Sequence, residues 1–195
     1  YIRSLMDSID TKKIREKNYR VLIETNGSRL GNYIMHRVLE EAGCSIVKYQ
    51  GQSRQEIKKT GYDLTCKLDY NCETVSLADE NGVEISKELQ NALIGLLYLK
   101  DKPDGKMAVP YTAPDIFNKL ADDYNCEIIR TKSSKQALMR EVYGTKLFSL
   151  YFDGIALLMK LLERMALDEV ALSQLVEEIP KFHMIEKEIP CPWTQ

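Results

Sequence analysis

The residues best suited to chemistry lie in a short acidic stretch in the first half of the chain. Asp69, Asn71 and Glu73 occupy alternate positions between two short apolar segments, at 64–68 and 74–78, that are typical of β-strands. Alternation in an extended segment puts the three oxygen-bearing side chains on one side. Such ligands suit a hard cation such as Mg²⁺ beside a substrate phosphate. Because only two of the three are carboxylates, the stretch predicts weak Mg²⁺ binding and no other cofactor.

A second group of polar residues follows a predicted strand in the other half of the chain. Thr131, Lys132 and Lys135 stand where a strand at 126–131 gives way to a helix at 133–142. Helix N-termini and the carboxyl edges of parallel sheets favour anions. We therefore expect a weak site for the phosphate of a sugar phosphate here, with an ordinary solvent-exposed helix start as the alternative.

No catalytic residue is predicted. The two histidines, His36 and His183, have no serine, cysteine or carboxylate placed in the sequence as a partner for a catalytic triad. The turn at 25–31 carries Arg29 and could hold an anion, but its spacing matches neither of the common glycine-rich phosphate-binding patterns. A tight turn followed by a helix cap is the favoured interpretation.

The composition excludes several classes of function. In 195 residues, 27 Lys and Arg against 29 Asp and Glu leave a net charge of −2, which gives no reason to expect nucleic-acid binding. No apolar run reaches the roughly 18 residues that a membrane span needs. The five scattered cysteines have no CxxC spacing, which favours free thiols in a reducing compartment, and we expect a cytoplasmic location. The chain starts at Tyr1 within a helical pattern, so we expect either a piece of a longer protein or a disordered start ahead of Tyr1.

The order of helix and strand patterns predicts an α/β fold. Strands are expected at 19–24, 44–49, 64–68, 74–78, 106–110, 126–131 and 146–151, and helices at 31–42, 53–60, 86–99, 113–124, 133–142, 153–165 and 173–179. This order indicates two consecutive three-layer α/β/α domains with mixed, mostly parallel sheets. The domains are placed at 1–86 and 87–180, followed by a linker at 181–195. Five apolar residues of the helix at 153–165 are expected to pack onto the second sheet: Leu157, Leu158, Leu161, Leu162 and Met165.

Several stretches resemble the phosphohexomutases, the phosphoglucomutase/phosphomannomutase superfamily. In the second half these are MAVPYTAPDIFNKLADDYNCEIIRTK, at 107–132, and DGIALLMKLLERMA, at 153–166. In the first half, RVLIETNGSRLGNYIMHRVLEEAGCSIV, at 20–47, and LADENGVEIS, at 77–86, are similar to the second domain of that family. The resemblance covers nearly the whole chain and implies the two middle domains of the phosphohexomutase fold.

Two further stretches narrow the resemblance. TKSSKQALM, at 131–139, and PKFHMIEKEIPCPW, at 180–193, look like a subgroup in which a mutase-like region follows a sugar-phosphate nucleotidyltransferase domain of the mannose-1-phosphate guanylyltransferase type. That resemblance implies a role in nucleotide-sugar biosynthesis.

The resemblance also implies lost chemistry. The metal loop of active mutases reads D-G-D-x-D-R, and the matching residues 69–74 read DYNCET, so the first Asp remains and the Arg is replaced by Thr74. The sugar-recognition loop, G-E-x-S-G-H, is expected between 142 and 153, where YGTKLFSLYF has nothing like it. The resemblance covers neither the domain that bears the phosphoserine nor the final phosphate-binding domain.

We therefore expect a catalytically degenerate mutase-like region that serves ligand binding, regulation or assembly. Its expected partners are hexose phosphate and the other domains of the parent chain. One alternative is a fragment of an active phosphoglucomutase or phosphomannomutase, an intramolecular phosphotransferase that moves phosphate between C6 and C1 of a hexose. A second alternative is an oligomerisation scaffold.

Overall fold

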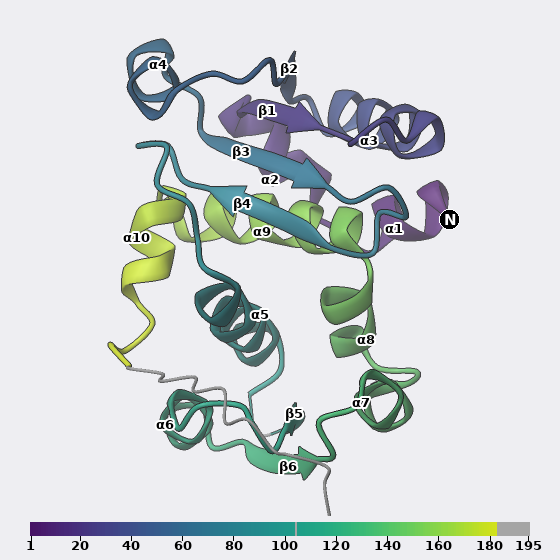
Figure 1. The fold of residues 1–195 in the computed structure, drawn as a ribbon, viewed down its shortest axis with the longest axis vertical. Coiled ribbons are helices and arrows are strands. Elements are labelled where there is room, and N and C mark those ends of the chain that lie inside the picture. The colour runs from purple at the N-terminus through teal and green to yellow at the C-terminus, as the bar shows by residue number, and fades with distance from the viewer. Residues whose placement is uncertain (104, 183–195) are drawn as a thin grey trace, which may run out of the picture.

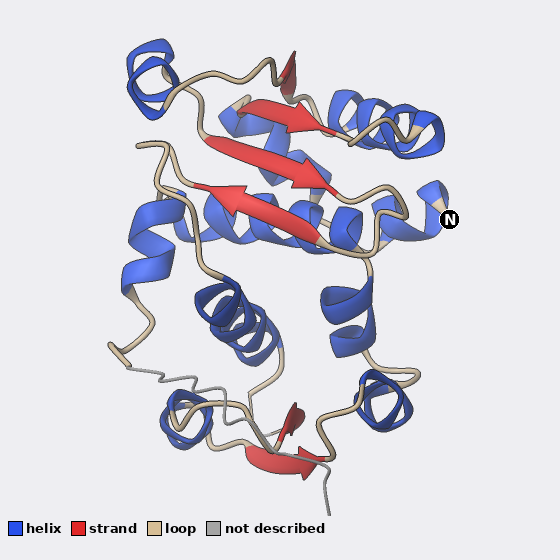
Figure 2. Ribbon diagram, viewed as in Figure 1, coloured by secondary structure: helices blue, strands red, loops and turns tan. Residues whose placement is uncertain are grey.

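The first half of the chain builds a four-stranded sheet (Figures 1 and 2). In the computed structural model, which describes residues 1–103 and 105–182, the strands are β1 (Arg20–Glu24), β2 (Ser45–Lys48), β3 (Leu64–Leu68) and β4 (Val75–Ala78). They lie in the order β2-β1-β3-β4. β1 runs parallel to both neighbours, and β4 runs antiparallel to β3. The predicted mixed, mainly parallel α/β architecture is therefore confirmed.

Alternation along β1 separates the two faces of this sheet. Val21 and Ile23 belong to the main core, whereas Leu22 lies in a small cluster with Ile57 of α4 (Arg54–Thr60) on the opposite face. The helices on the main-core side include α1 (Ile2–Asp7), α2 (Thr11–Lys17) and α3 (Arg29–Glu41). Helices on both faces give the three layers that the sequence predicts.

The second half of the chain surrounds a smaller pair of strands. Its elements are α5 (Lys87–Asp101), β5 (Lys106–Pro110), α6 (Ile116–Asp123), β6 (Glu127–Thr131), α7 (Lys135–Val142), α8 (Lys146–Phe152), α9 (Gly154–Asp168) and α10 (Leu172–Glu177). β5 and β6 are parallel, with Met107 opposite Ile128. A Cβ on Gly95 of α5 would meet the Phe117 ring at 3.1 Å, so this glycine lets α5 and α6 approach closely.

Residues 146–151 lie in helix α8 and not in the predicted strand. Leu147 and Leu150, three positions apart, are both buried, and α8 packs against α5 and α9. A spacing of three places side chains on one face of a helix. The strand prediction was wrong because it rested on a short apolar run, which helices and strands share.

The sheet that helix α9 packs on is the first and not the second, so the prediction that it covers the second sheet was wrong. It contacts α2, β3 and β4 as well as α5 and α8, and in Figure 1 it runs beside β4. Its five predicted core residues are buried as expected, in one core that continues from the first half into the second. A helix that is apolar around most of its circumference lies between layers. The apolar pattern therefore predicts burial but does not choose the sheet.

Hydrogen bonds also join elements across the predicted boundary at residue 86. The backbone N–H of Ser173, at the start of α10, donates to Glu80 Oε2 at 3.2 Å, and the N–H of Asp10 donates to Glu163 Oε1 at 2.6 Å. The division into 1–86 and 87–180 stays a prediction. Most of the predicted linker at 181–195 lies outside the described residues.

An ionic network ties α9 to α5. Arg164 bridges Asp101 at 2.6 Å and Asp168 at 3.1 Å, and Lys100 contacts Asp168 at 2.6 Å. Lys160 also pairs with Asp101. In the part of the chain that the structure describes, no helix is long and apolar enough to cross a bilayer.

Candidate functional site

The carboxyl end of the first sheet opens into a cavity of about 840 Å³. Four segments line it: Tyr1, the turn that follows β1 with the start of α3, the loop between β3 and β4, and the corner between α8 and α9. Its polar lining side chains include Ser28, Arg29, Asn71, Cys72, Glu73 and Asp153. The acidic loop therefore lies where open α/β sheets commonly bind ligands.

Asp69 holds the acidic loop together. One carboxylate oxygen accepts the backbone N–H of Glu73 at 2.9 Å, and the other accepts the Thr74 hydroxyl at 2.8 Å. The Asp69 N–H donates to the Thr74 carbonyl at 3.1 Å. Both carboxylate oxygens thus accept hydrogen bonds from the loop itself, and Asp69 stabilises the loop conformation.

Glu73 turns toward the second half of the chain. Its Oε2 lies 2.6 Å from the Nζ of Lys135, which also lies 5.6 Å from the centre of the Phe152 ring. The sequence placed Glu73 in a metal site and Lys135 in a separate phosphate site, and the structure joins the two. Since the two side chains are 47% and 55% exposed, the pair contributes at most about 1 kcal/mol to stability.

The resemblance implies Mg²⁺ at this loop, and the residues present do not fit it. Each oxygen of Asp69 already accepts a hydrogen bond from the loop, Glu73 is paired with a lysine, and Asn71 offers only a neutral amide oxygen. Among residues 1–103 and 105–182, no group of three or more His, Cys, Asp or Glu residues is arranged to hold a metal ion. A Mg²⁺ ion needs several oxygen ligands in near-octahedral geometry.

Cys72 links the loop to two helices, a role that sequence reasoning missed. A Cβ on Gly31 of α3 would clash with Cys72 Sγ, and the N–H of Gly154 donates to the Cys72 carbonyl at 2.9 Å. Burial raises the pKa of the Cys72 thiol, and the side chain of Ser28 partly opposes this shift. The backbone of Cys72 has a positive φ, +61°, which residues other than glycine rarely adopt. Because this conformation is unfavourable by itself, we infer that the contacts to α3 and α9 stabilise the tight turn.

Asp153 caps α9 and holds Tyr1 at the rim of the cavity. Its Oδ1 accepts the N–H groups of Ile155 and Ala156 at 3.1 and 3.0 Å, which is an ordinary N-cap arrangement. The Tyr1 hydroxyl lies 2.9 and 2.8 Å from the two Asp153 oxygens. Burial, together with this carboxylate, raises the pKa of Tyr1. The contact spans 152 positions, so no local pattern predicts it.

The predicted phosphate site offers less than its sequence indicates. Thr131 is buried, and its hydroxyl donates to the Lys132 carbonyl at 3.1 Å. Ser134 caps α7 by accepting the N–H of Ala137 at 3.3 Å. Lys135 is paired with Glu73. Lys132 is exposed and has no ion pair within the described part of the chain, so of the three predicted residues it is the cation left to bind an anion.

The segment where the family's sugar-recognition loop is expected supplies an aromatic wall instead. Phe148 and Phe152 of α8 line the cavity, with ring centres 5.3 Å apart. Tyr143 meets Phe148 edge to face at 6.0 Å. An apolar wall of this kind gives no carboxylate or imidazole to bind sugar hydroxyls.

The amino-acid sequence of the chain is similar to those of proteins named as mutases. No family profile matches the chain. It is 20% identical, over an alignment 219 positions long, to a phosphoglucomutase/phosphomannomutase of Thermococcus kodakarensis, covering 95% of this chain and 48% of that protein. It is 25% identical, over an alignment 227 positions long, to a probable phosphoglucosamine mutase of Pyrococcus abyssi, covering 98% of this chain and 48% of that protein. The chain spans about half the length of these curated relatives.

Solved structures share the fold. A putative phosphomannomutase from Thermus thermophilus matches with a TM-score of 0.73 at 13% identity, over 92% of this chain and 49% of that one. A phosphoglucomutase/phosphomannomutase family protein from Burkholderia thailandensis matches with a TM-score of 0.70 at 13% identity, over 91% and 47%. The chain thus has a phosphohexomutase-like α/β fold. The names of its sequence relatives support a relationship to the phosphoglucomutase/phosphomannomutase superfamily.

Proposed function

We propose that this chain is a catalytically degenerate phosphohexomutase-like region of a sugar-phosphate nucleotidyltransferase, with a role in nucleotide-sugar metabolism in the cytoplasm. It serves ligand binding, regulation or assembly within its parent protein. One observation carries the proposal: the loop that resembles a mutase metal loop is bonded to itself and to Lys135. A loop whose carboxylates are already partnered has little left for a cation and a phosphate.

The cavity beside the loop supports a remaining ligand-binding role. Its volume, about 840 Å³, is in the range of small-molecule sites, and Arg29 stands at its edge. Hexose phosphates are the proposed ligands, because the names of the relatives denote mutases of hexose and hexosamine phosphates. Lys132 and Lys135, with Thr131, stay a separate proposed anion site, since none of the three lines this cavity. The binding is weak, since an exposed lysine contributes little alone.

A Mg²⁺ titration by calorimetry tests this proposal on the chain itself. A restored variant carries Tyr70→Gly, Asn71→Asp, Glu73→Asp and Thr74→Arg, which recreate the loop pattern of active mutases. The native chain is expected to bind Mg²⁺ at least about tenfold more weakly than the restored variant, because the latter gains a carboxylate and frees the loop from Lys135.

The control is Tyr70→Gly alone, which alters the loop without adding an oxygen ligand. It should leave Mg²⁺ binding as weak as in the native chain. Native Mg²⁺ binding as tight as in the restored variant, and abolished by Asp69→Ala, would show that the loop is a working metal site and would refute the proposal.

The second candidate is a fragment of an active mutase. The alignments favour it, since both relatives bear mutase names and cover nearly all of this chain. This candidate requires that the native chain bind Mg²⁺ as tightly as the restored variant does, and that Asp69→Ala abolish the binding.

A further inference from the structure

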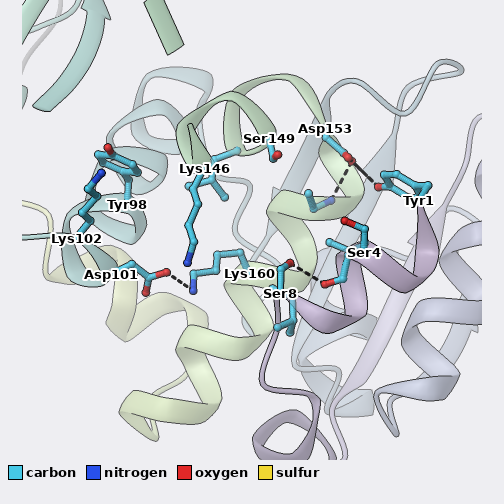
Figure 3. Close-up of a pocket in the computed structure, with 14 residues that line it drawn as sticks. Tyr1, Ser4, Ser8, Tyr98, Asp101, Lys102, Lys146, Ser149, Asp153 and Lys160 are labelled. Carbon is cyan, nitrogen blue, oxygen red and sulfur yellow. Dashed lines mark hydrogen bonds and ion pairs between the residues drawn. The ribbon is translucent and has the colours of Figure 1, made fainter. Parts of the chain in front are cut away.

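A second cavity, of about 420 Å³, lies where the two halves of the chain meet (Figure 3). Elements α1, α5, α8 and α9 surround it. It shares the Tyr1–Asp153 rim with the cavity described above but contains none of the loop residues 69–74. Its size falls in the range that small organic ligands occupy in proteins.

The walls of this second cavity are mostly apolar. Leu5 and Ile9 approach from the N-terminal segment, and Leu150 and Ala156 approach from α8 and α9. Tyr98 adds a ring from α5, and its hydroxyl is engaged with the Lys106 carbonyl at 3.1 Å. These surfaces suit the apolar body of a ligand better than the hydroxyl-covered ring of a sugar.

One end of the second cavity carries excess positive charge. Lys160 pairs with Asp101, whose other oxygen is held by Arg164 at 2.6 Å. Each Asp101 oxygen is thus paired with a cation, and Lys160 also pairs with Glu163. Lys102 and Lys146 also line the cavity, and neither has a hydrogen-bonded or ionic partner for its ammonium group within the described residues. Figure 3 shows Lys146 extending from α8 toward the Asp101–Lys160 pair.

We propose that this second cavity binds a small organic anion, with its charged group at Lys146 and its apolar body against Leu5 and Leu150. The exposed hydroxyl of Ser149 also lies on the lining, on the Asp153 side of the cavity in Figure 3. A charge-assisted hydrogen bond gives the attraction, and burial of the apolar body gives affinity that a simple anion lacks. The proposal does not rest on the function proposed above, because no residue of the acidic loop takes part. The two cavities share Tyr1, Ser149 and Asp153, so the Ser4 and Lys146 variants, at residues that line the second cavity and not the first, tell the two sites apart.

An amide NMR titration with phenyl phosphate tests this inference. Shifts are expected at α1, α8 and the start of α9, with inorganic phosphate and benzyl alcohol each binding about tenfold or more weakly, because each lacks one half of the recognised ligand. Benzoate in place of phenyl phosphate distinguishes a carboxylate from a phosphate as the preferred charged group.

Two variants and one control make the test specific. Lys146→Met should weaken phenyl phosphate binding about tenfold, the loss of one charge-assisted hydrogen bond. Ser4→Trp, at an exposed position on α1 that lines the cavity, should block it. Lys119→Met removes an exposed lysine of α6 outside the cavity lining and should leave binding unchanged.

Three outcomes overturn the inference. The first is phenyl phosphate binding that Lys146→Met or Ser4→Trp leaves unaltered while circular dichroism shows both variants folded. The second is inorganic phosphate binding as tightly as phenyl phosphate, which means that the apolar walls take no part. The third is an absence of shifts at these helices into the millimolar range of phenyl phosphate.

Discussion

Replacing Gly154 with alanine tests the contact by which α9 fixes the acidic loop. A Cβ at this position would meet Leu68 Cδ2 at 2.7 Å and the carbonyl carbon and oxygen of Thr74 at 3.0 and 3.1 Å. Carbon atoms in ordinary contact lie about 3.5–4.0 Å apart. The end of a leucine can turn aside, but the Thr74 carbonyl is held by the N–H of Asp69. The backbone contact is therefore the one that resists the new methyl group.

The sign of the stability change separates two explanations. Helix propensity alone predicts that Gly154→Ala stabilises the fold by up to about 1 kcal/mol. Overpacking a tight contact typically costs about 1–3 kcal/mol. With both effects present, we expect a net loss of about 1–2 kcal/mol in the free energy of unfolding.

Urea denaturation followed by far-UV circular dichroism measures this change. The double variant Gly154→Ala/Leu68→Ala is the matched control, because removing the leucine end relieves part of the clash. Its cost should fall below the sum of the two single costs by about 0.5 kcal/mol or more. A Gly154→Ala variant as stable as the native chain, or more stable, would refute the close packing of α9 on the loop.

Three further predictions follow from the packing and charge of α9 and α7. Leu161→Ala should lower the free energy of unfolding, measured by urea titration, by about 2–5 kcal/mol, because Leu161 is 0% exposed. The control Leu167→Ala, at a residue 42% exposed on the same helix, should lower it by less than about 1 kcal/mol. Equal losses would mean that α9 is misplaced. Burial raises the pKa of Asp168, but hydrogen bonds from its two basic partners outweigh this and hold the pKa below its ordinary value. Its stabilising effect is therefore full above the unfolded-state pKa of about 3.9 and is lost as the pH falls through the folded-state value, so Asp168→Asn should flatten the loss of stability in acid. An acid profile unchanged by that variant would contradict the assignment. Lys135→Met should cost less than about 1 kcal/mol, since its ion pair is half exposed; a loss above about 2 kcal/mol would mean that the pair is structurally central.

The parts of the fold that depend on local pattern could be predicted from the sequence. The strands of the first sheet show either alternating apolar and polar residues or a short continuous run of apolar residues. The turn from Asp79 to Gly82, where Gly82 has a positive φ, ends β4. The loop between β3 and β4 was likewise found from its residue types. Residues 146–151 could not be assigned in this way, because Leu147 and Leu150 have the same apolar character in a strand and in a helix.

The contacts that define the candidate site are long-range, and for that reason the sequence did not reveal them. Glu73 and Lys135 are 62 positions apart, and each is an ordinary surface charge by local criteria. The docking of Gly154 on the loop depends on α9 returning to the first sheet, which no amphipathic pattern specifies. The second cavity likewise arises where four separate elements meet.

The most direct test of the central claim is a mutase assay of the natural full-length gene product. Conversion of glucose 1-phosphate to glucose 6-phosphate is followed with Mg²⁺ and a hexose bisphosphate activator. A degenerate region predicts no turnover above the rate without protein. Turnover above that rate, lost in the Asp69→Asn variant, would show that the acidic loop still holds the metal of a working mutase and would contradict the account.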